Sequence, residues 1–418
     1  MSILYTLGIY LYLLFIRLAA FFHPKAKLWW NGRKNWAGKL SAELSSKRKA
    51  DQTLIWVHSA SLGEFEQGRP LMEAIKQQHP EVFILLTFFS PSGYEIRKNY
   101  PHAGLVCYLP ADLPGNARKF LAIVKPNLAI FVKYEFWYNF LNSLHKQKTP
   151  VWLIAALFRP QQPFFQPWGR WYLQILWGFE HFFVQNQSSV ELLEKHQLQQ
   201  YTLAGDPRID RVLQIAAEAK PFPRVESFAQ NSSVLMTGST WGPDEALLAG
   251  LWENQELRKG WKLIIAPHEI GASHLEQIEQ KFGAQCIRYS QFQAEEHVNR
   301  TVLIIDNIGM LSALYRYATI AYIGGGFGAG IHNTLEPMAF GLPVIFGPKY
   351  QKFEEAVVNV KTGGAFVVQG QKELNQVFSQ LKVTAFSSKA STAVQQYLQE
   401  NQGATLKIMA RLKRIIKD

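Results

Sequence analysis

The 418-residue sequence contains only two cysteines, Cys107 and Cys286, and they lie far apart in the chain. Each is near an apolar run, so the sequence predicts neither a disulfide framework nor a thiolate metal site. An Asp-x-Asp pair is absent as well. Such a pair is the usual seat for a divalent metal on a diphosphate, and no His/Cys cluster replaces it. We therefore expect no metal and no other cofactor.

Acidic side chains are scarce relative to basic ones, with 32 Asp and Glu against 44 Lys and Arg. The first 50 residues contain nine Lys and Arg but only one acidic residue, Glu43. Most of these basic residues follow an apolar run, residues 3–22, in which Arg17 is the one charged side chain. Because Arg17 can extend its charge to a membrane surface, the run of about 20 residues is long enough for a membrane anchor over 1–22. No small-residue cleavage site follows, so we expect an uncleaved anchor.

The basic residues behind the run predict that the rest of the chain lies on the cytoplasmic side of the membrane. The aromatic and basic tract over residues 21–30 is typical of a membrane interface. The segment either crosses the bilayer once or lies on it, and a buried N-terminal helix is the alternative to both. Basic charge also suits nucleic acid, but the sequence has no recognisable nucleic-acid motif, so we expect no such partner.

Beyond the anchor, short apolar runs alternate with helical patterns, which predicts an α/β architecture with parallel sheets. The first series of runs covers 54–58, 83–88, 128–132, 151–155 and 181–184, and the second covers 234–237, 262–266, 302–305, 320–323 and 343–346. The stretch Pro221-Phe222-Pro223 between them is typical of a linker. We expect two Rossmann-like domains, 23–220 and 224–390, with a ligand cleft between them and a basic amphipathic helix over 391–418.

Three consecutive glycines, Gly324, Gly325 and Gly326, follow the apolar run 319–323. They allow a backbone to approach a ligand closely. A helix beginning near Asn333 would direct its free N–H groups at an anion, and Glu336 in its first turn would accept hydrogen bonds from a ribose. The segment predicts nucleotide binding. The alternative is a plain turn whose glycines only relieve crowding.

Two other segments of the second half suit a phosphate. Ser239 and Thr240 follow a glycine and are expected to open a helix, whose N-terminus attracts anions. His268 ends the next predicted strand, where it either hydrogen-bonds a phosphate or is an ordinary surface histidine.

In the first half, residues 56–64 lead from a strand into a helix. Ser61 and Gly63 keep the turn small and polar, and Glu64 is expected at the helix entrance, where a carboxylate can act as a general base on a hydroxyl. The alternative is that Glu64 only complements the helix dipole. Lys133 and Glu135 end another strand. Both are candidates for the acceptor side of the cleft.

These segments resemble one family closely, the Kdo transferases, which move 3-deoxy-D-manno-octulosonic acid (Kdo) from CMP-Kdo to the lipid A precursor. The matching motifs occur in family order at 58–64, 89–91, 135–137, 238–240 and 325–348. The resemblance implies a two-domain GT-B fold, with the acceptor handled by the first domain and CMP by the second. It implies a general base at Glu64. It places the nucleotide site at Ser239, Thr240, His332, Asn333 and Glu336.

The implied activity is an inverting, metal-independent Kdo transfer in lipopolysaccharide biosynthesis, at the inner membrane. The implied partners are CMP-Kdo, the lipid A precursor and the membrane surface. The sequence departs from the family at Lys133, where an acidic residue is usual, and beside His268, where an arginine is missing. The alternatives are another lipid-directed GT-B transferase that uses a UDP-sugar, and a membrane-anchored binding homologue without catalysis.

Overall fold

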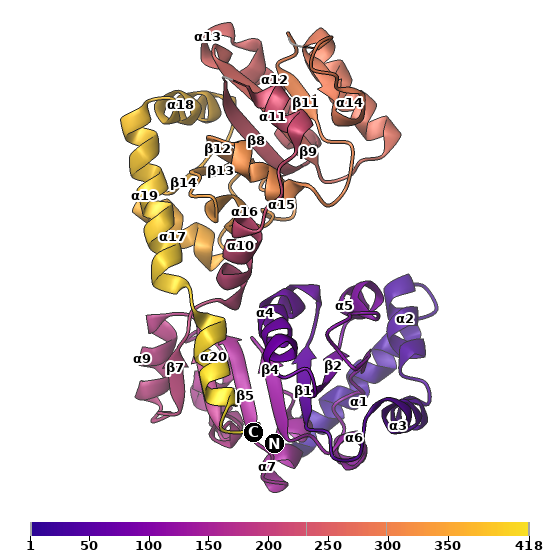
Figure 1. Cartoon of the computed structure of the whole chain (residues 1–418). Helices are drawn as coiled ribbons and strands as arrows, with labels where there is room; N and C mark the ends of the chain where they lie inside the picture. The colour runs from indigo at the N-terminus through magenta and orange to yellow at the C-terminus, as the bar shows by residue number, and fades with distance from the viewer. Residues whose placement is uncertain (1, 231, 298, 417–418) are drawn as a thin grey trace. The chain divides into compact units, whose positions relative to one another are not determined.

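The computed structural model describes residues 2–230, 232–297 and 299–416. The chain forms two compact units, of which the first comprises Met1–Asp210 and Asn401–Asp418 and the second Arg211–Glu400 (Figure 1). Each unit is built on a seven-stranded sheet in which every pair of neighbouring strands is parallel. The predicted GT-B type of α/β fold, with two Rossmann-like parts and an apolar N-terminal helix, is confirmed.

The sheet of the first unit has the strand order β3-β2-β1-β4-β5-β6-β7. Its strands are β1 (Leu54–Ser59), β2 (Phe83–Phe88), β3 (Leu105–Tyr108), β4 (Leu128–Val132), β5 (Val151–Ala156), β6 (His181–Val184) and β7 (Tyr201–Leu203). Its helices are α1 (Ser2–Ala19), α2 (Pro24–Gly32), α3 (Trp36–Lys47), α4 (Leu62–Gln78), α5 (Pro91–Arg97), α6 (Pro114–Val124), α7 (Tyr138–Lys146), α8 (Arg170–Leu173), α9 (Gln187–Lys195) and α20 (Ala404–Leu412).

Both faces of this sheet are covered, which is why its central strands are continuous apolar runs in the sequence. Alternate residues of β1 belong to two different cores. Leu54 and Trp56 pack with α3, α6 and α7, whereas Ile55 and Val57 pack with α4 and α20. The two-residue period of a strand thus divides one apolar run between two layers of helices.

The sheet of the second unit has the order β10-β11-β9-β8-β12-β13-β14. Its strands are β8 (Ser233–Thr240), β9 (Trp261–Pro267), β10 (Cys286–Arg288), β11 (Val302–Ile304), β12 (Ile320–Ile323), β13 (Val344–Phe346) and β14 (Ala365–Val367). Its helices are α11 (Pro223–Ala229), α12 (Gly242–Glu253), α13 (Gln255–Arg258), α14 (Ala272–Phe282), α15 (Leu311–Leu314), α16 (Leu335–Met338), α17 (Glu354–Thr362), α18 (Gln371–Leu381) and α19 (Thr384–Asn401).

The connections between the units differ in detail from the expected ones. The units divide between Asp210 and Arg211, inside α10 (Pro207–Ala217), and not at 221–223. The Pro221-Phe222-Pro223 stretch stays with the second unit, because the amide of Phe222 donates to the Tyr317 hydroxyl at 2.7 Å and Pro223 begins α11.

The chain does not end in the single helix expected over 391–418. Gly403, which has a left-handed φ of 86°, separates α19 from α20. Only glycine adopts this conformation at little cost, so the break is encoded at that position. The last two residues of the expected helix, 417 and 418, lie outside the described residues, as does residue 1 of the expected anchor.

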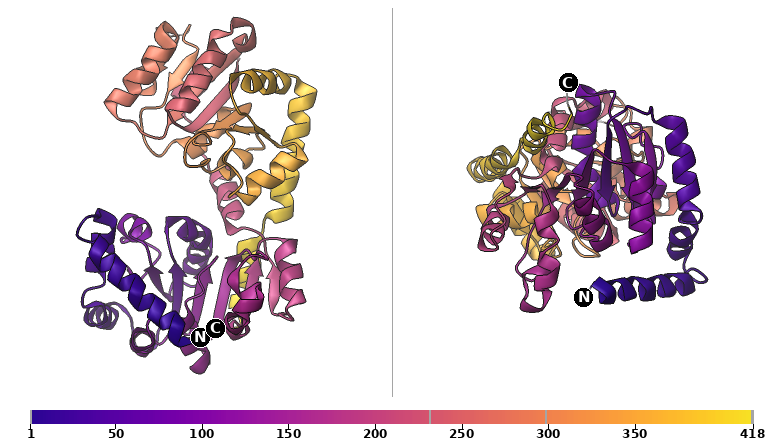
Figure 2. Two further views of the ribbon diagram at one scale, coloured as in Figure 1. Left: turned by 180° about the vertical axis from the view of Figure 1, so that it is seen from behind. Right: turned by 90° about the horizontal axis from the view of Figure 1, so that it is seen from below.

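The helix α1 lies on the outside of the first unit, where Figure 2 shows it in indigo. It is long and apolar enough to cross a membrane, and none of its residues is fully buried. No other helix of the described residues meets the same criteria of length and composition.

Candidate functional site

The carboxyl edge of the first sheet contains the turn from β1 into α4, and this turn holds Glu64. The Glu64 Oε2 atom accepts hydrogen bonds from the amide of Ser61, at 3.0 Å, and from the Ser61 hydroxyl. Glu64 is the third residue of α4, so this contact is one half of a capping box. Gly63 is exposed and leaves the turn uncrowded. Glu64 therefore has a helix-capping role in the structure, and its half-buried carboxylate is held in one orientation.

A second carboxylate, Glu135, lies in a buried chain of hydrogen bonds beneath the same edge. Its Oε2 atom is 3.2 Å from His58 Nε2 and accepts from Trp137 Nε1 at 2.6 Å. The other ring nitrogen of His58 is 2.8 Å from Thr87 Oγ1, and that oxygen accepts from Trp56 Nε1 at 2.8 Å. Each side-chain N–H and O–H of this chain has an acceptor if His58 carries its proton on Nε2 and Thr87 donates to Nδ1.

Glu135 is only 8% exposed and His58 is fully buried, so this chain of hydrogen bonds holds both side chains in fixed orientations. Sequence reasoning placed His58 in a motif but gave it no role of its own. The signal for it was a histidine at the end of an otherwise apolar strand, where a buried imidazole needs partners on both nitrogens.

Lys133 follows β4 in a left-handed conformation with φ of 67°, so the strand ends at Val132. The strand does not continue to Glu135, because the backbone turns at Lys133. Lys133 lies near Asp206, which Arg208 also contacts through Nε at 2.9 Å and Nη2 at 2.6 Å. Burial favours the neutral form of Asp206, but Arg208 and Lys133 more than offset it, so the Asp206 pKa is lowered.

In the second unit, Ser239 and Thr240 do not open a helix as expected. They form the end of β8, and α12 begins at Gly242. Ser239 has a left-handed φ of 54°, and the register between β8 and β9 shifts at this point. The buried Thr240 hydroxyl donates to Glu245 Oε1 at 3.2 Å, so an internal carboxylate already occupies it.

The three glycines after β12 are required by the packing of backbone against backbone. A Cβ atom on Gly324 would lie 2.4 Å from the carbonyl oxygen of Ser239, and one on Gly326 would lie 2.6 Å from the Cα atom of Gly347. Gly325 has φ of 91°, and its amide donates to Asp244 Oδ2 at 2.9 Å. Crowding is therefore a sufficient reason for all three glycines, as in the alternative interpretation of the sequence.

The helix expected near Asn333 is the single turn α16, which begins at Leu335. A helix this short has only a small dipole, so its N-terminus attracts an anion only weakly. Asn333 instead organises the loop. Its Oδ1 atom accepts from the amide of Leu335 at 3.1 Å, and its Nδ2 atom donates to Glu336 Oε1 at 2.9 Å.

Two of the predicted residues, His268 and His332, stack on each other with ring centroids 4.5 Å apart. Trp241 also stacks on His268, at 4.5 Å, and donates from Nε1 to His332 Nε2 at 3.0 Å. Burial lowers the His332 pKa, and His268 lowers it further. The structure thus brings three ring planes together at the carboxyl edge of the second sheet. Trp241 was not predicted. Its only indication in the sequence is that an aromatic residue directly follows Thr240, a hydroxyl residue.

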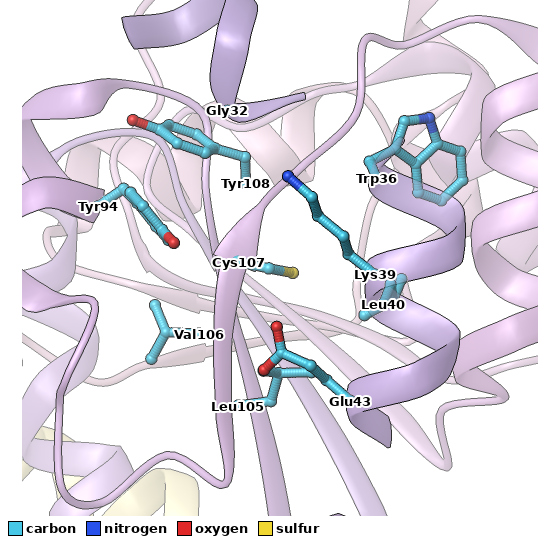
Figure 3. Close-up of a pocket in the computed structure, with 10 residues that line it drawn as sticks. All are labelled: Gly32, Trp36, Lys39, Leu40, Glu43, Tyr94, Leu105, Val106, Cys107 and Tyr108. Carbon is cyan, nitrogen blue, oxygen red and sulfur yellow. The ribbon is translucent and has the colours of Figure 1, made fainter. Parts of the chain in front are cut away.

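A cavity of about 150 Å³ lies elsewhere in the first unit, between α3 and β3 (Figure 3). It contains none of the predicted site residues. Burial raises the pKa of Cys107 in its wall to about 12, so this thiol stays protonated and is a poor nucleophile. Within 2–230, 232–297 and 299–416, no group of three or more His, Cys, Asp or Glu side chains is arranged to hold a metal ion.

Residues 34–211 match the family described as 3-deoxy-D-manno-octulosonic-acid transferase (kdotransferase). The 3-deoxy-D-manno-octulosonic acid transferase of Aquifex aeolicus is 28% identical over 357 residues, which cover 84% of this chain and 91% of that protein. The enzyme of the same name from Haemophilus influenzae is 26% identical over 383 residues, 86% of each chain.

Among solved structures, UDP-GlcNAc 2-epimerase from Neisseria meningitidis aligns with 87% of this chain and 100% of its own, at a TM-score of 0.61 and 14% identity. A likeness at this identity concerns the fold alone. The sequence relatives carry the functional information, and they agree with each other. Over most of its length this chain is similar to the Kdo transferases, and residues 34–211 match the N-terminal domain of that family.

Proposed function

We propose that this protein is an inverting, metal-independent glycosyltransferase that moves Kdo from CMP-Kdo to the lipid A precursor. Its relationship to the Kdo transferases supports the broader statement that it is a glycosyltransferase. The observation that carries the specific proposal is the orientation of the Glu64 carboxylate at the carboxyl edge of the first sheet, where α/β proteins bind their ligands.

The two oxygen atoms of Glu64 have different surroundings. Both hydrogen bonds from Ser61 reach Oε2. Among the described residues, no recorded hydrogen bond reaches Oε1. Ser61 therefore orients the carboxylate without occupying the atom that would accept a proton. In the proposed reaction, Oε1 removes the proton from an acceptor hydroxyl as that hydroxyl attacks the anomeric carbon of Kdo and CMP leaves. One such displacement inverts the configuration at that carbon.

The donor is proposed to bind the second unit. Trp241, His268 and His332 offer ring faces and ring nitrogens, and Glu336 offers a carboxylate that accepts from ribose hydroxyls. CMP-Kdo has a single phosphate, so hydrogen bonds are sufficient to stabilise its departure where a diphosphate would call for a metal. His268 is exposed, and in this proposal its ring donates a hydrogen bond to the phosphate of CMP-Kdo.

The acceptor has acyl chains in a bilayer and phosphates at its surface. The apolar helix α1 and the basic residues behind it suit such a surface, through burial of apolar area and attraction of anionic groups. We propose that the protein acts at the cytoplasmic side of the inner membrane, with no nucleic acid among its partners.

The test is the substitution Glu64→Gln in the full-length protein. Glutamine also forms capping boxes, so the substitution keeps the helix entrance while it removes the base. We expect a rate loss on the order of a hundredfold or more with CMP-Kdo and a lipid A precursor. Glu66→Gln, two residues along the same helix, is the matched control. Glu66 pairs with Arg69 and Arg97, and we expect its loss to leave turnover nearly unchanged.

Near-normal turnover by a folded Glu64→Gln protein would overturn the assignment of the base.

A second experiment measures wild-type activity in excess EDTA, where we expect full activity. Activity that is lost in EDTA and returns with a divalent ion would overturn the metal-free mechanism. Competition of CMP against UDP separates the proposal from a UDP-sugar transferase. Nucleotide binding without turnover would instead identify a binding homologue.

A further inference from the structure

The helix α1 contacts the first unit along one edge over most of its length. Its half-buried positions include Tyr5, Ile9, Leu13 and Ile16, which recur every three or four residues. That spacing places these residues on one face of an α-helix, as a single stripe. The stripe faces the folded body, so α1 lies along the unit and does not project away from it (Figures 1 and 2).

Near its N-terminus, α1 is joined to the body by a polar contact. The Tyr5 hydroxyl donates to Asp112 Oδ2 at 2.8 Å. Asp112 is only 1% exposed, and it also accepts from the amides of Asn139 and Phe140, each at 3.0 Å, where α7 begins. The ring of Tyr5 lies 5.5 Å from that of Tyr138. The start of α1 is therefore held against the N-terminal end of α7.

The rest of α1 is held by aromatic contacts. The ring of Tyr12 lies 5.9 Å from that of Trp29 and 6.2 Å from that of Phe89. The guanidinium of Arg17 lies 5.8 Å from the ring centroid of Trp30. The contacts from Tyr5 to Arg17 span about 18 Å of helix, at about 1.5 Å per residue.

The opposite edge of α1 is exposed and apolar. Leu4, Leu7 and Leu11 are 63%, 56% and 54% exposed, and Phe15 is 60% exposed. Phe21 and Phe22, just beyond the helix, are 77% and 91% exposed. A continuous apolar surface of this extent marks an interaction site. The basic residues Arg17, Lys25 and Lys27 lie beside it in the sequence, so the complementary partner is apolar with a negatively charged border. An anionic bilayer surface has both properties.

We propose that α1 is an in-plane anchor: it lies in the surface of a bilayer with its outer edge among the acyl chains and does not cross the membrane. A hydrocarbon core is about 30 Å thick, so a crossing α1 would place the stretch from Tyr5 to Arg17 inside it. The body contacts along that stretch, including the buried carboxylate of Asp112, would then have to enter the hydrocarbon or be broken. Lying in the plane keeps all of them and still buries the outer edge.

The test is the side of the membrane from which the N-terminus can be labelled. In a Cys107→Ser, Cys286→Ser background, Ser2→Cys reports on the start of α1, and Gly115→Cys reports on the body. Gly115 is exposed, and a side chain there meets no neighbouring atom within 4 Å. Each protein is labelled with a membrane-impermeant maleimide in sealed vesicles of both orientations.

We expect both cysteines to react in the same orientation of vesicle. A Ser2→Cys protein that reacts only in the orientation where Gly115→Cys is protected would show that α1 crosses the bilayer and would overturn the proposal. Full-length protein that does not sediment with anionic phospholipid vesicles would overturn it as well, because α1 would then be an ordinary surface helix. Neither result depends on Kdo transfer, so the inference and the proposed function fail separately.

Discussion

At the scale of single residues, the carboxylates of Glu64 and Glu135 in the first unit differ in burial and not in how many hydrogen bonds they accept. Each accepts two hydrogen bonds on its Oε2 atom, Glu135 from His58 and Trp137 and Glu64 from Ser61, but Glu135 is buried and Glu64 is half-buried. We therefore propose Glu64, and not Glu135, as the carboxylate that a substrate reaches. The sequence showed both residues in motifs but did not distinguish their environments.

A corresponding prediction for the second unit concerns the role of Glu336 in CMP binding. The substitution Glu336→Ala removes the carboxylate that Asn333 orients, and we expect CMP affinity to fall by about 1–3 kcal/mol, or about 5- to 150-fold, because a ribose hydroxyl would lose its partner. Turnover at saturating donor should change less, since this contact is present in the ground state and the transition state alike. Calorimetry with CMP measures the first quantity and steady-state kinetics the second.

Glu400→Ala, at an exposed position of α19 in the same unit, is the control and should bind CMP normally. Unchanged CMP affinity in Glu336→Ala would mean that the nucleotide binds elsewhere.

At the scale of secondary-structure elements, the loop after β12 is shaped by the strands beside it. Its glycines allow the backbone to pass Ser239, at the end of β8, and Gly347, just after β13, at distances that no side chain permits. The loop is thus part of the packing of the sheet, and its position determines where His332 and Glu336 lie. A ligand is not needed to explain the glycines, although the loop can still bind one.

Gly326→Ala tests this packing role, because its Cβ atom would lie 2.6 Å from the Cα atom of Gly347. Backbone has to move to relieve that overlap, so we expect a loss of about 1–3 kcal/mol in the free energy of unfolding. Gly328→Ala is the matched control in the same loop, since its Cβ atom would meet its nearest neighbour, the Gly325 carbonyl oxygen, at 3.5 Å. Urea denaturation measures both, and equal stability of the two variants would contradict the packing argument.

At the scale of the whole molecule, the chain returns to its first unit after completing the second. Asp210 accepts from the amides of Gly403 and Thr405, at 2.6 and 2.7 Å, and so fixes the start of α20. Ile408, Met409 and Leu412 then join the core that α4 covers. The last residues of the sequence therefore complete a hydrophobic core whose strands begin about 350 residues earlier.

Ile408→Ala measures that contribution. Ile408 is fully buried, and its truncation should lower the free energy of unfolding by about 2–5 kcal/mol through lost burial and a residual cavity. Leu406→Ala, two residues earlier on the same helix, is 71% exposed in the wild type and should change stability by less than about 0.5 kcal/mol. If thermal and urea denaturation gave similar losses for both, α20 would not be part of the core.

The sequence by itself determined the features that depend on local pattern. Apolar runs that alternate with helical segments predicted two parallel sheets, and the apolar stretch before the basic residues predicted α1. The order of the motifs predicted the Kdo transferase relationship. Each of these signals is carried by residues close together in the chain, where composition and periodicity are sufficient.

Only the tertiary structure decided the features that depend on residues far apart in sequence. The extension of β8 through Thr240 and the placement of α20 by Asp210 each depart from the expected element. The stack of Trp241, His268 and His332, and the contact of Tyr5 with Asp112, join segments that local periodicity does not relate. The physical reason is that hydrogen bonds and packing satisfy buried groups with whatever lies nearby in space, and the sequence pattern specifies only the local part of that environment.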